Sequence, residues 1–254
     1  DVKDKLKQLF PQQAIDQINL PHLMASDSSS PSSRMHLKLE DIATAARSIN
    51  KQGAVGPDGM HVRIPTLPWS PTSFTDLQEK TQKVILKAYN CQANGLIPPA
   101  VRQLYTVNMG TIISKMVDGV EDPSKFRPIQ WGNAHARLQA RATMMAMRAE
   151  ASEIFASSQY GVGRKNGVEA IIHLVRHTLS SHKEMAMLLT DKSAAFQSFH
   201  TDGGLYATMT HAPRLTNSYL ANHSKPSKVV FHAKSDSQDQ YTSLTLHQER
   251  GGPQ

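Results

Sequence analysis

The stretch Met185–Phe199, MAMLLTDKSAAFQSF, decides how the fold of the chain is interpreted. It begins with five apolar residues, Met185–Leu189, and it carries no charge before Asp191. A short apolar run without alternation predicts a strand that is covered on both faces. Asp191 would then follow the carboxyl end of a buried strand, where α/β enzymes often bind their ligands. The local alternative is that Asp191 only caps a helix that begins at Lys192.

Length and composition limit the architecture and the class of partner. The chain has 254 residues, of which 39% are hydrophobic and 6% aromatic, so it can bury a mainly aliphatic core. Its formal net charge is +7 at pH 7, which permits a polyanionic partner. The single cysteine, Cys91, excludes an internal disulfide and a Cys-rich zinc site. No apolar run is long enough to span a membrane, so no membrane partner is expected.

The start of the chain differs in composition from the rest. Residues 1–34 are predicted to be a helical N-terminal extension that ends in the Ser-rich linker ASDSSSPSSR at 25–34. The first residue is Asp and not Met, which predicts that the sequence is a piece of a longer protein.

Hydrophobic periodicity predicts the secondary structure after this linker. Helices are expected at 39–49, 75–95, 134–156 and 168–180, from Pro98 onward, and between 200 and about 220. Strands are expected at 107–113, 229–232 and 241–246, with a short extended piece at 126–131. The Pro-rich segment 61–74 is expected to be extended, and the GPDG sequence at 56–59 predicts a tight turn.

Six segments carry a further signal because of their order in the chain. They are AVGPDGM at 54–60, GLIPPAVRQLYTVNMGTIISK at 95–115, SKFRPIQW at 124–131, SQYGVGRKNGVEAI at 158–171, LLTDKSAAFQSF at 188–199 and RGGPQ at 250–254. In this order they resemble the motifs of the reverse transcriptase domain of non-LTR retrotransposons and, more distantly, those of group II intron enzymes. The resemblance extends from about Leu39 to Gln254.

This resemblance implies an α+β fold, namely the fingers and a partial palm of a right-hand polymerase, rich in helices and with a small, mostly antiparallel sheet. Residues 35–180 would be the fingers-like region and 181–254 the partial palm, with Met185–Leu189 as its central strand. The implied activity is that of an RNA-directed DNA polymerase, which uses an RNA template, a DNA primer and deoxynucleoside triphosphates. A retrotransposon enzyme would act in the nucleus. An organelle is the alternative location.

The resemblance also assigns a metal site and a nucleotide gate. Nucleotidyl transfer uses two metal ions about 3.5–4 Å apart, and hard oxygen ligands suit Mg²⁺. Asp191 is the implied catalytic residue, and its carboxylate and the backbone carbonyl of Lys192 are the implied metal ligands. Phe196 would lie beneath the sugar of the incoming nucleotide and reject a 2′-hydroxyl. The local alternative for Phe196 is core packing.

The remaining implied contacts involve the nucleotide and the template. Arg127, in the FRPI segment, would bind the triphosphate through paired hydrogen bonds, and Lys115 would be a second, weaker contact. Gln254 would lie near the template base and the nascent pair. The residues implied to contact the template, all in the Gly-rich turn QYGVGRKN, are Gly161, Gly163 and Arg164.

Two features of the sequence leave a second function open. No Asp-Asp pair occurs in the 254 residues, although the palm of the family carries one, and Gln197 stands where the family commonly has an acidic residue or Asn. Because one carboxylate cannot hold two metal ions, the 254-residue chain alone is predicted to be inactive. The alternative is an inactive reverse transcriptase-like domain that serves as an RNA-binding or structural component of a larger ribonucleoprotein assembly.

Overall fold

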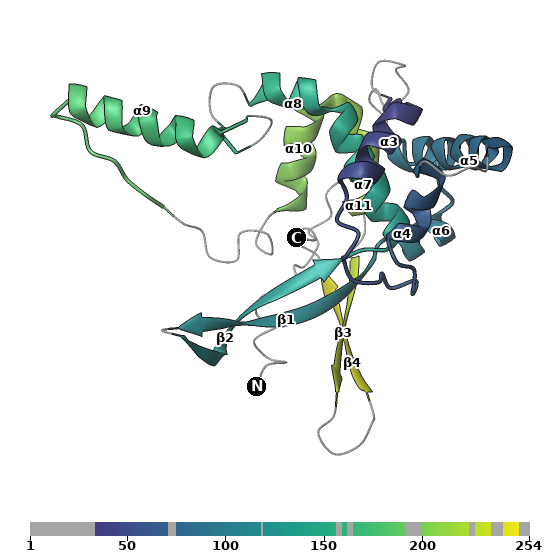
Figure 1. Cartoon of the computed structure of the whole chain (residues 1–254). Coiled ribbons are helices and arrows are strands. Elements are labelled where there is room, and N and C mark those ends of the chain that lie inside the picture. Colours follow the sequence, from purple (N-terminus) through teal and green to yellow (C-terminus); the bar gives the residue numbers. More distant parts are fainter. Residues whose placement is uncertain are drawn as a thin grey trace.

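The computed structural model describes residues 34–70, 75–117, 119–155, 159–161, 165–190, 200–223, 227–234 and 241–248. Within these ranges the chain is rich in helices and contains a mixed four-stranded sheet (Figure 1). The α+β class expected from the sequence is therefore confirmed. Residues 1–33 of the helical extension expected at the start of the chain lie outside the described residues.

Most of the predicted helices are confirmed to within a few residues at each end. The helices are α3 (Leu39–Ser48), α4 (Arg63–Thr66), α5 (Thr75–Ala93), α6 (Pro99–Tyr105), α7 (Ala134–Ala146), α8 (Arg148–Ile154), α9 (Gly167–Ser181), α10 (Thr201–His211) and α11 (Thr216–His223), with the 3-10 turns η2 (Leu67–Trp69) and η3 (Pro213–Leu215). The segment expected as one helix at 134–156 is two helices, which meet at Met147. The extended segment expected at 61–74 is wrong for residues 63–69, which form α4 and η2. Pro68 lies in the first turn of η2, where a proline has no amide hydrogen bond to lose.

The sheet joins two hairpins through one parallel pairing. Its strands are β1 (Val107–Val117), β2 (Val120–Trp131), β3 (Ser227–Lys234) and β4 (Tyr241–Gln248), in the order β2-β1-β3-β4. β1 and β2 are antiparallel, as are β3 and β4, and β3 joins β1 in parallel over residues 107–110. The strands expected at 107–113, 229–232 and 241–246 are therefore confirmed, and each extends further than its sequence pattern indicated.

The central strand expected at Met185–Leu189 is a wrong prediction. Residues 185–190 follow α9 without regular secondary structure, and none of the four described strands pairs with them. Leu188 and Leu189 are 85% and 80% exposed. Apolar side chains favour burial, but they do not determine which strand, if any, will form hydrogen bonds with the backbone of the segment. In this structure β1 has β2 and β3 as its neighbours instead.

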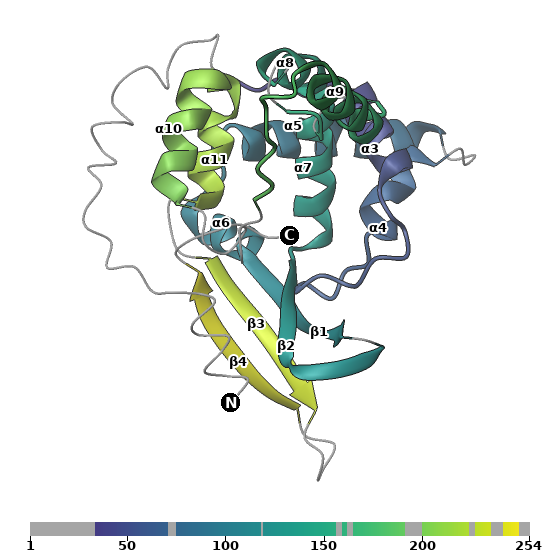
Figure 2. The same cartoon turned by 90° about the vertical axis from the view of Figure 1, so that its left-hand side faces the viewer.

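Three helices enclose the main hydrophobic core. α3, α5 and α7 turn apolar faces toward one another, and Figure 2 shows these helices above the sheet. The buried residues of this core are Met35, Leu37, Ile42, Ala45, Ala46, Tyr89, Ala93, Leu138, Ala142 and Met147.

A smaller apolar cluster covers one face of the sheet. Its members are Phe126 of β2, Val229 and Phe231 of β3, and Leu244 and Leu246 of β4. Gly110 of β1 lies under the ring of Phe231, and a side chain at this position would overlap that ring. A glycine is therefore favoured here by the close approach of the Phe231 ring and not by its backbone angles.

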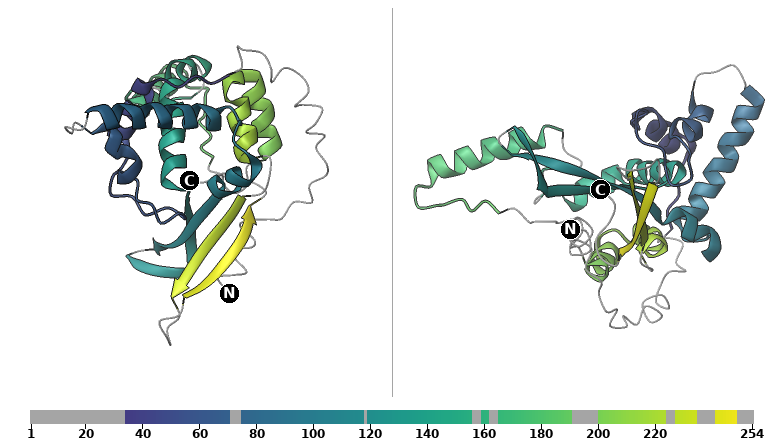
Figure 3. Two further views of the ribbon diagram at one scale, coloured as in Figure 1. Left: turned by 90° about the vertical axis from the view of Figure 1, so that its right-hand side faces the viewer. Right: turned by 90° about the horizontal axis from the view of Figure 1, so that it is seen from below.

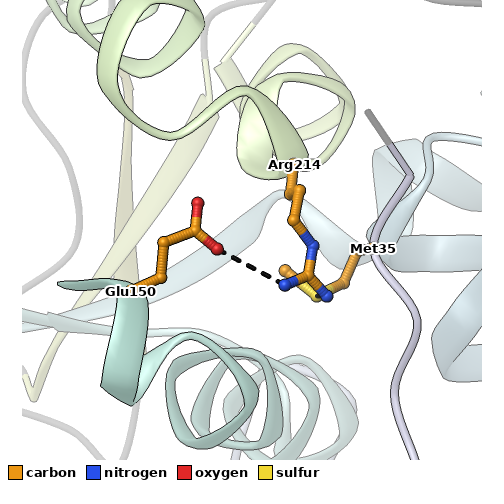
Figure 4. A network of polar contacts seen from close by, with 3 residues as sticks. All are labelled: Met35, Glu150 and Arg214. Carbon is orange, nitrogen blue, oxygen red and sulfur yellow. Dashed lines mark hydrogen bonds and ion pairs between the residues drawn. The ribbon is translucent and has the colours of Figure 1, made fainter. Parts of the chain in front are cut away.

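Helices α10 and α11 are connected to the core through η3. Arg214 of η3 donates from Nη1 to Oε2 of Glu150 in α8 at 3.3 Å, and its Nη2 lies 3.9 Å from the sulfur of Met35 (Figure 4). By contrast, α9 extends away from the helical core (Figures 1 and 3). No helix in the described part of the chain has the length and apolar character needed to cross a membrane.

Candidate functional site

The structure describes only some of the site residues that the sequence predicts. Lys115 lies in β1, Arg127 in β2 and Gly161 in the short stretch 159–161. The predicted site residues outside the described part of the chain are Gly163, Arg164, Asp191, Lys192, Phe196 and Gln254. The roles predicted for those six residues therefore stay predictions.

The β1–β2 hairpin carries both predicted basic residues. Arg127 pairs with Ile113 across the hairpin, and the register shifts just before Lys115, so that Lys115 lies opposite Asp122. An uninterrupted ladder would have placed Lys115 opposite Lys125. The Arg127 side chain is exposed, so it can reach a ligand in solution.

Arg127 belongs to a face of the sheet that is open to solvent. Residues paired in register point to the same side, and alternate residues of a strand share a face. Arg127 pairs with Ile113 and Lys228 pairs with Val107, which lies an even number of residues from Ile113, so the two cations share one face. The exposed side chains of this face, called here the open sheet face, are Thr111, Ile113, Arg127, Lys228, His232, Ser243 and Thr245.

The open sheet face favours an anionic ligand. Among its described side chains it has two permanent cations, three hydroxyl groups and no carboxylate. The opposite face of the sheet holds the apolar cluster around Phe231. This division follows from the two-residue period of the strands, with apolar side chains on the covered face and polar ones on the other.

Gly161 takes part in a local turn before α9. Its amide donates to Oε1 of Gln159 at 2.8 Å. Asn166, the residue before α9, has a φ of 57°, and Gly167 lies so close to the carbonyl of Tyr160 that a side chain there would overlap it. These contacts give the described part of the turn a structural role in starting α9.

The described residues provide no metal site. No group of three or more His, Cys, Asp or Glu side chains in these ranges could hold a metal ion. The predicted ligands Asp191 and Lys192 lie outside the ranges, so no chemical step through Mg²⁺ is derived from the geometry.

A cavity of about 320 Å³ lies where the helical core meets the sheet. Residues from α5, α6, α7 and α11 line it, together with the beginnings of β1 and β3 and the end of β2. Sequence patterns did not reveal this cavity, because its wall comes from segments far apart in the chain. The one local signal was the set of polar residues, such as Gln92 and Gln139, at buried positions of amphipathic helices.

Among the described residues that line the cavity, Arg137 carries a charge and several others are polar and neutral. Nη2 of Arg137 donates to the carbonyl of Ala54 at 2.7 Å, and burial lowers the pKa of Arg137 without removing its charge. Burial lowers the pKa of His223, so its imidazole is neutral at pH 7. Burial also raises the pKa of Tyr105, with a smaller contribution from the charge of Asp58. None of the described residues that line the cavity is Asp or Glu.

A part-buried polar pair joins α5 to α7. The hydroxyl of Tyr89 and Nδ1 of His135 lie 2.9 Å apart. Burial lowers the pKa of His135, which keeps the imidazole neutral and able to accept a hydrogen bond from the hydroxyl. Burial also raises the pKa of Tyr89, so the hydroxyl stays protonated. The pair is thus a neutral hydrogen bond inside the core.

Comparison of the chain with protein-family models and with curated proteins finds no match.

Proposed function

We propose that the chain carries the fingers and part of the palm of an RNA-directed DNA polymerase, which in the complete protein copies RNA into DNA by two-metal nucleotidyl transfer. The order of the six segments that resemble reverse transcriptase motifs is the observation that carries this proposal. The proposed partners are an RNA template, a DNA primer and deoxynucleoside triphosphates.

The open sheet face supports the proposal. Arg127, the residue that the resemblance assigns to the triphosphate, is exposed there on the same face as Lys228. Phosphate groups are bound by exposed cations and hydroxyl groups, and a neighbouring carboxylate would oppose them. The backbone of Lys115 lies on the strand next to that of Arg127, close to the same part of the hairpin.

The catalytic part of the proposal rests on the sequence. It assigns Mg²⁺ to the carboxylate of Asp191 and the carbonyl of Lys192, and the discrimination against ribonucleotides to Phe196. Gln254 and the turn with Gly161, Gly163 and Arg164 would contact the nascent pair and the template. When bound, the metal would stabilise the charge that develops on the transferred phosphate.

Binding of an RNA–DNA hybrid tests the proposed role of the open sheet face. The 254-residue chain is titrated into a fluorescently labelled hybrid, and anisotropy is recorded at several salt concentrations. We expect Arg127→Gln to weaken binding about three- to tenfold and to reduce the slope of log affinity against log salt by about one, as loss of one phosphate contact requires. Arg176→Gln, which removes another exposed arginine, on α9, is the matched control. Equal affinities of the two variants would contradict the assignment of Arg127.

Primer extension separates the polymerase from its alternative. On a poly(rA) template with an oligo(dT) primer and Mg²⁺, the protein that carries this chain should extend the primer, and Asp191→Asn should abolish extension while hybrid binding persists. Hybrid binding without any extension would instead favour the RNA-binding or structural component.

A further inference from the structure

The cavity at the junction of helices and sheet has the size of a small-ligand site. Its volume of about 320 Å³ falls at the lower end of the range of about 300–1,000 Å³ that is typical of ligand pockets. It shares no residue with the open sheet face, so a ligand here would be additional to the proposed nucleic acid and triphosphate.

Four carboxamide side chains give the cavity its polar character. They are Gln92, Asn108, Gln139 and Asn222, and the first three are only 5%, 6% and 3% exposed. A carboxamide presents a donor and an acceptor side by side, and this pattern matches the hydrogen-bonding edge of a nucleobase. Two of them are held in place by the protein, because Gln139 donates to Thr143 Oγ1 at 2.9 Å and Asn222 donates to Ser218 O at 2.8 Å.

Two buried polar atoms of lining residues have no hydrogen-bond partner in the described structure. They are the carbonyl oxygen Oε1 of Gln92 and the donor Nε of Arg137. A buried polar atom without a partner is costly, so a ligand that supplies the missing bond is favoured. The ligand should therefore donate to Gln92 and accept from Arg137, as the N–H and carbonyl or ring-nitrogen groups of a heterocycle can.

The aromatic and charged side chains that line the cavity narrow the chemical class of ligand that it can bind. Tyr105 and Trp131 line the cavity, and aromatic side chains of this kind can stack on a planar ligand. Among the described residues that line the cavity, Arg137 carries a charge and none is Asp or Glu, so a cationic ligand is disfavoured. Among the described lining residues, the imidazole of His223 is the one strong metal ligand, which disfavours a metal ion, and a purely apolar ligand would leave Oε1 of Gln92 without a hydrogen-bond partner.

We infer that this cavity binds the base of a nucleoside or nucleotide, with the carboxamides of Gln92 and Asn108 reading its polar edge and Tyr105 or Trp131 stacking on its face. The inference stands apart from the polymerase proposal, because it requires neither Arg127 nor Asp191.

The two tryptophans of the chain allow a direct test. Trp69→Phe leaves Trp131 as the single tryptophan, so its fluorescence reports on the cavity. This variant is titrated with uridine, cytidine, adenosine and guanosine, and with ribose 5-phosphate and inorganic phosphate as ligands without a base. Calorimetry on the unmodified chain checks each affinity. Saturable binding of at least one nucleoside, without binding of ribose 5-phosphate or phosphate, is expected.

Two variants locate the binding within the cavity. Gln92→Met keeps the size of the side chain but removes the acceptor, and it should weaken binding about three- to tenfold. Ala136→Phe fills the cavity and should abolish binding, whereas Thr111→Ala on the open sheet face should leave it unchanged. Circular dichroism verifies that each variant is folded. If a variant does not fold, the comparison of nucleosides with ribose 5-phosphate on the unmodified chain decides whether the cavity binds a base. The inference is overturned if no nucleoside binds, if ribose 5-phosphate binds as well as a nucleoside, or if folded Ala136→Phe still binds.

Discussion

The carboxamide of Asn94 binds both backbone polar groups of Met35. Its Oδ1 accepts from the Met35 amide at 2.9 Å, and its Nδ2 donates to the Met35 carbonyl at 2.7 Å. One turn earlier in α5, Asn90 repeats the arrangement on Leu37, at 2.8 Å and 3.1 Å. The side chains of Asn90 and Asn94 thus make the backbone hydrogen bonds that a neighbouring strand would otherwise supply, and they hold residues 35–37 against the core.

Asn94→Ala should lower the free energy of unfolding by about 1–3 kcal/mol, because it removes both hydrogen bonds to Met35 and a third to the carbonyl of Asn90, and it leaves the part-buried amide and carbonyl of Met35 unpaired. Asn94→Asp keeps the acceptor and should have an intermediate effect. Urea denaturation measures both. Gln103→Ala, at an exposed position of α6, is the control and should change stability by less than about 0.5 kcal/mol. A loss no larger than that of the control would show that the contacts to Met35 do not stabilise the fold.

Gly110→Ala should destabilise the sheet by about 1–3 kcal/mol, because the new methyl group would overlap the ring of Phe231. The double variant Gly110→Ala with Phe231→Leu should recover part of the loss, since the smaller side chain makes room for the methyl group. Gly203→Ala in α10 is the matched control. Its new methyl group would lie 4.0 Å from Cβ of His200, an ordinary van der Waals contact, and alanine favours a helix, so stability should stay equal or rise. Thermal denaturation followed by circular dichroism distinguishes these outcomes.

Acid should destabilise the helical core through two histidines. Burial lowers the pKa of both His135 and His223 below the ordinary value of 6.5, so the folded chain binds fewer protons than the unfolded chain. Their contribution to stability is therefore fully present above about pH 6.5, and it is lost as the pH falls toward the folded-state pKa values.

Urea denaturation at pH 7.5 and pH 5 measures this loss, with both pH values chosen to bracket the ordinary histidine pKa of about 6.5. The substitutions His135→Gln and His223→Gln should each reduce the difference between the two conditions. His173→Gln, on an exposed position of α9, should leave it unchanged. If the difference in stability between pH 7.5 and pH 5 is the same in His135→Gln, His223→Gln and the unmodified chain, the acid sensitivity arises from other residues.

The ion pair between Arg214 and Glu150 should contribute modestly to the free energy of unfolding, because its side chains are 35% and 31% exposed. A double-mutant cycle with Arg214→Met and Glu150→Gln should give a coupling energy of about 0.5–1 kcal/mol that decreases with added salt. The exposed pair of Lys83 and Glu79 on α5 serves as the comparison and should couple less strongly. Equal coupling in the two pairs would indicate that the partial burial of Arg214 adds nothing.

Local patterns in the sequence predicted most helices and three strands of the described structure. The periodicities behind α3, α5 and α9, and the apolar residues of β1, depend on neighbours a few positions away. The same reasoning failed at Met185–Leu189, because the apolar run carries no information about its pairing partner. It also failed at Pro68, where proline starts a 3-10 turn instead of extending the chain.

The candidate site was predictable only in part. The sequence singled out Arg127, and the exposed position of this side chain on β2 is compatible with the proposed contact. It did not single out Lys228, because only the register of β3 on β1 reveals that the two cations share a face. The cavity was not predicted either, since Gln92, Trp131 and Asn222 come together only when the helices and the sheet assemble.

The parallel pairing of β3 with β1 sets the order in which the sheet can form. Val107 pairs with Lys228, 121 positions later in the chain, whereas β1 and β2 are adjacent in sequence. During synthesis the β1–β2 hairpin therefore emerges well before β3 and exposes an unpaired edge of β1 until then. Contacts of such long sequence separation form slowly, so the pairing of β3 with β1 should be a late step in the formation of the sheet. While the edge of β1 is free, its unpaired backbone groups can pair with strands of other nascent chains.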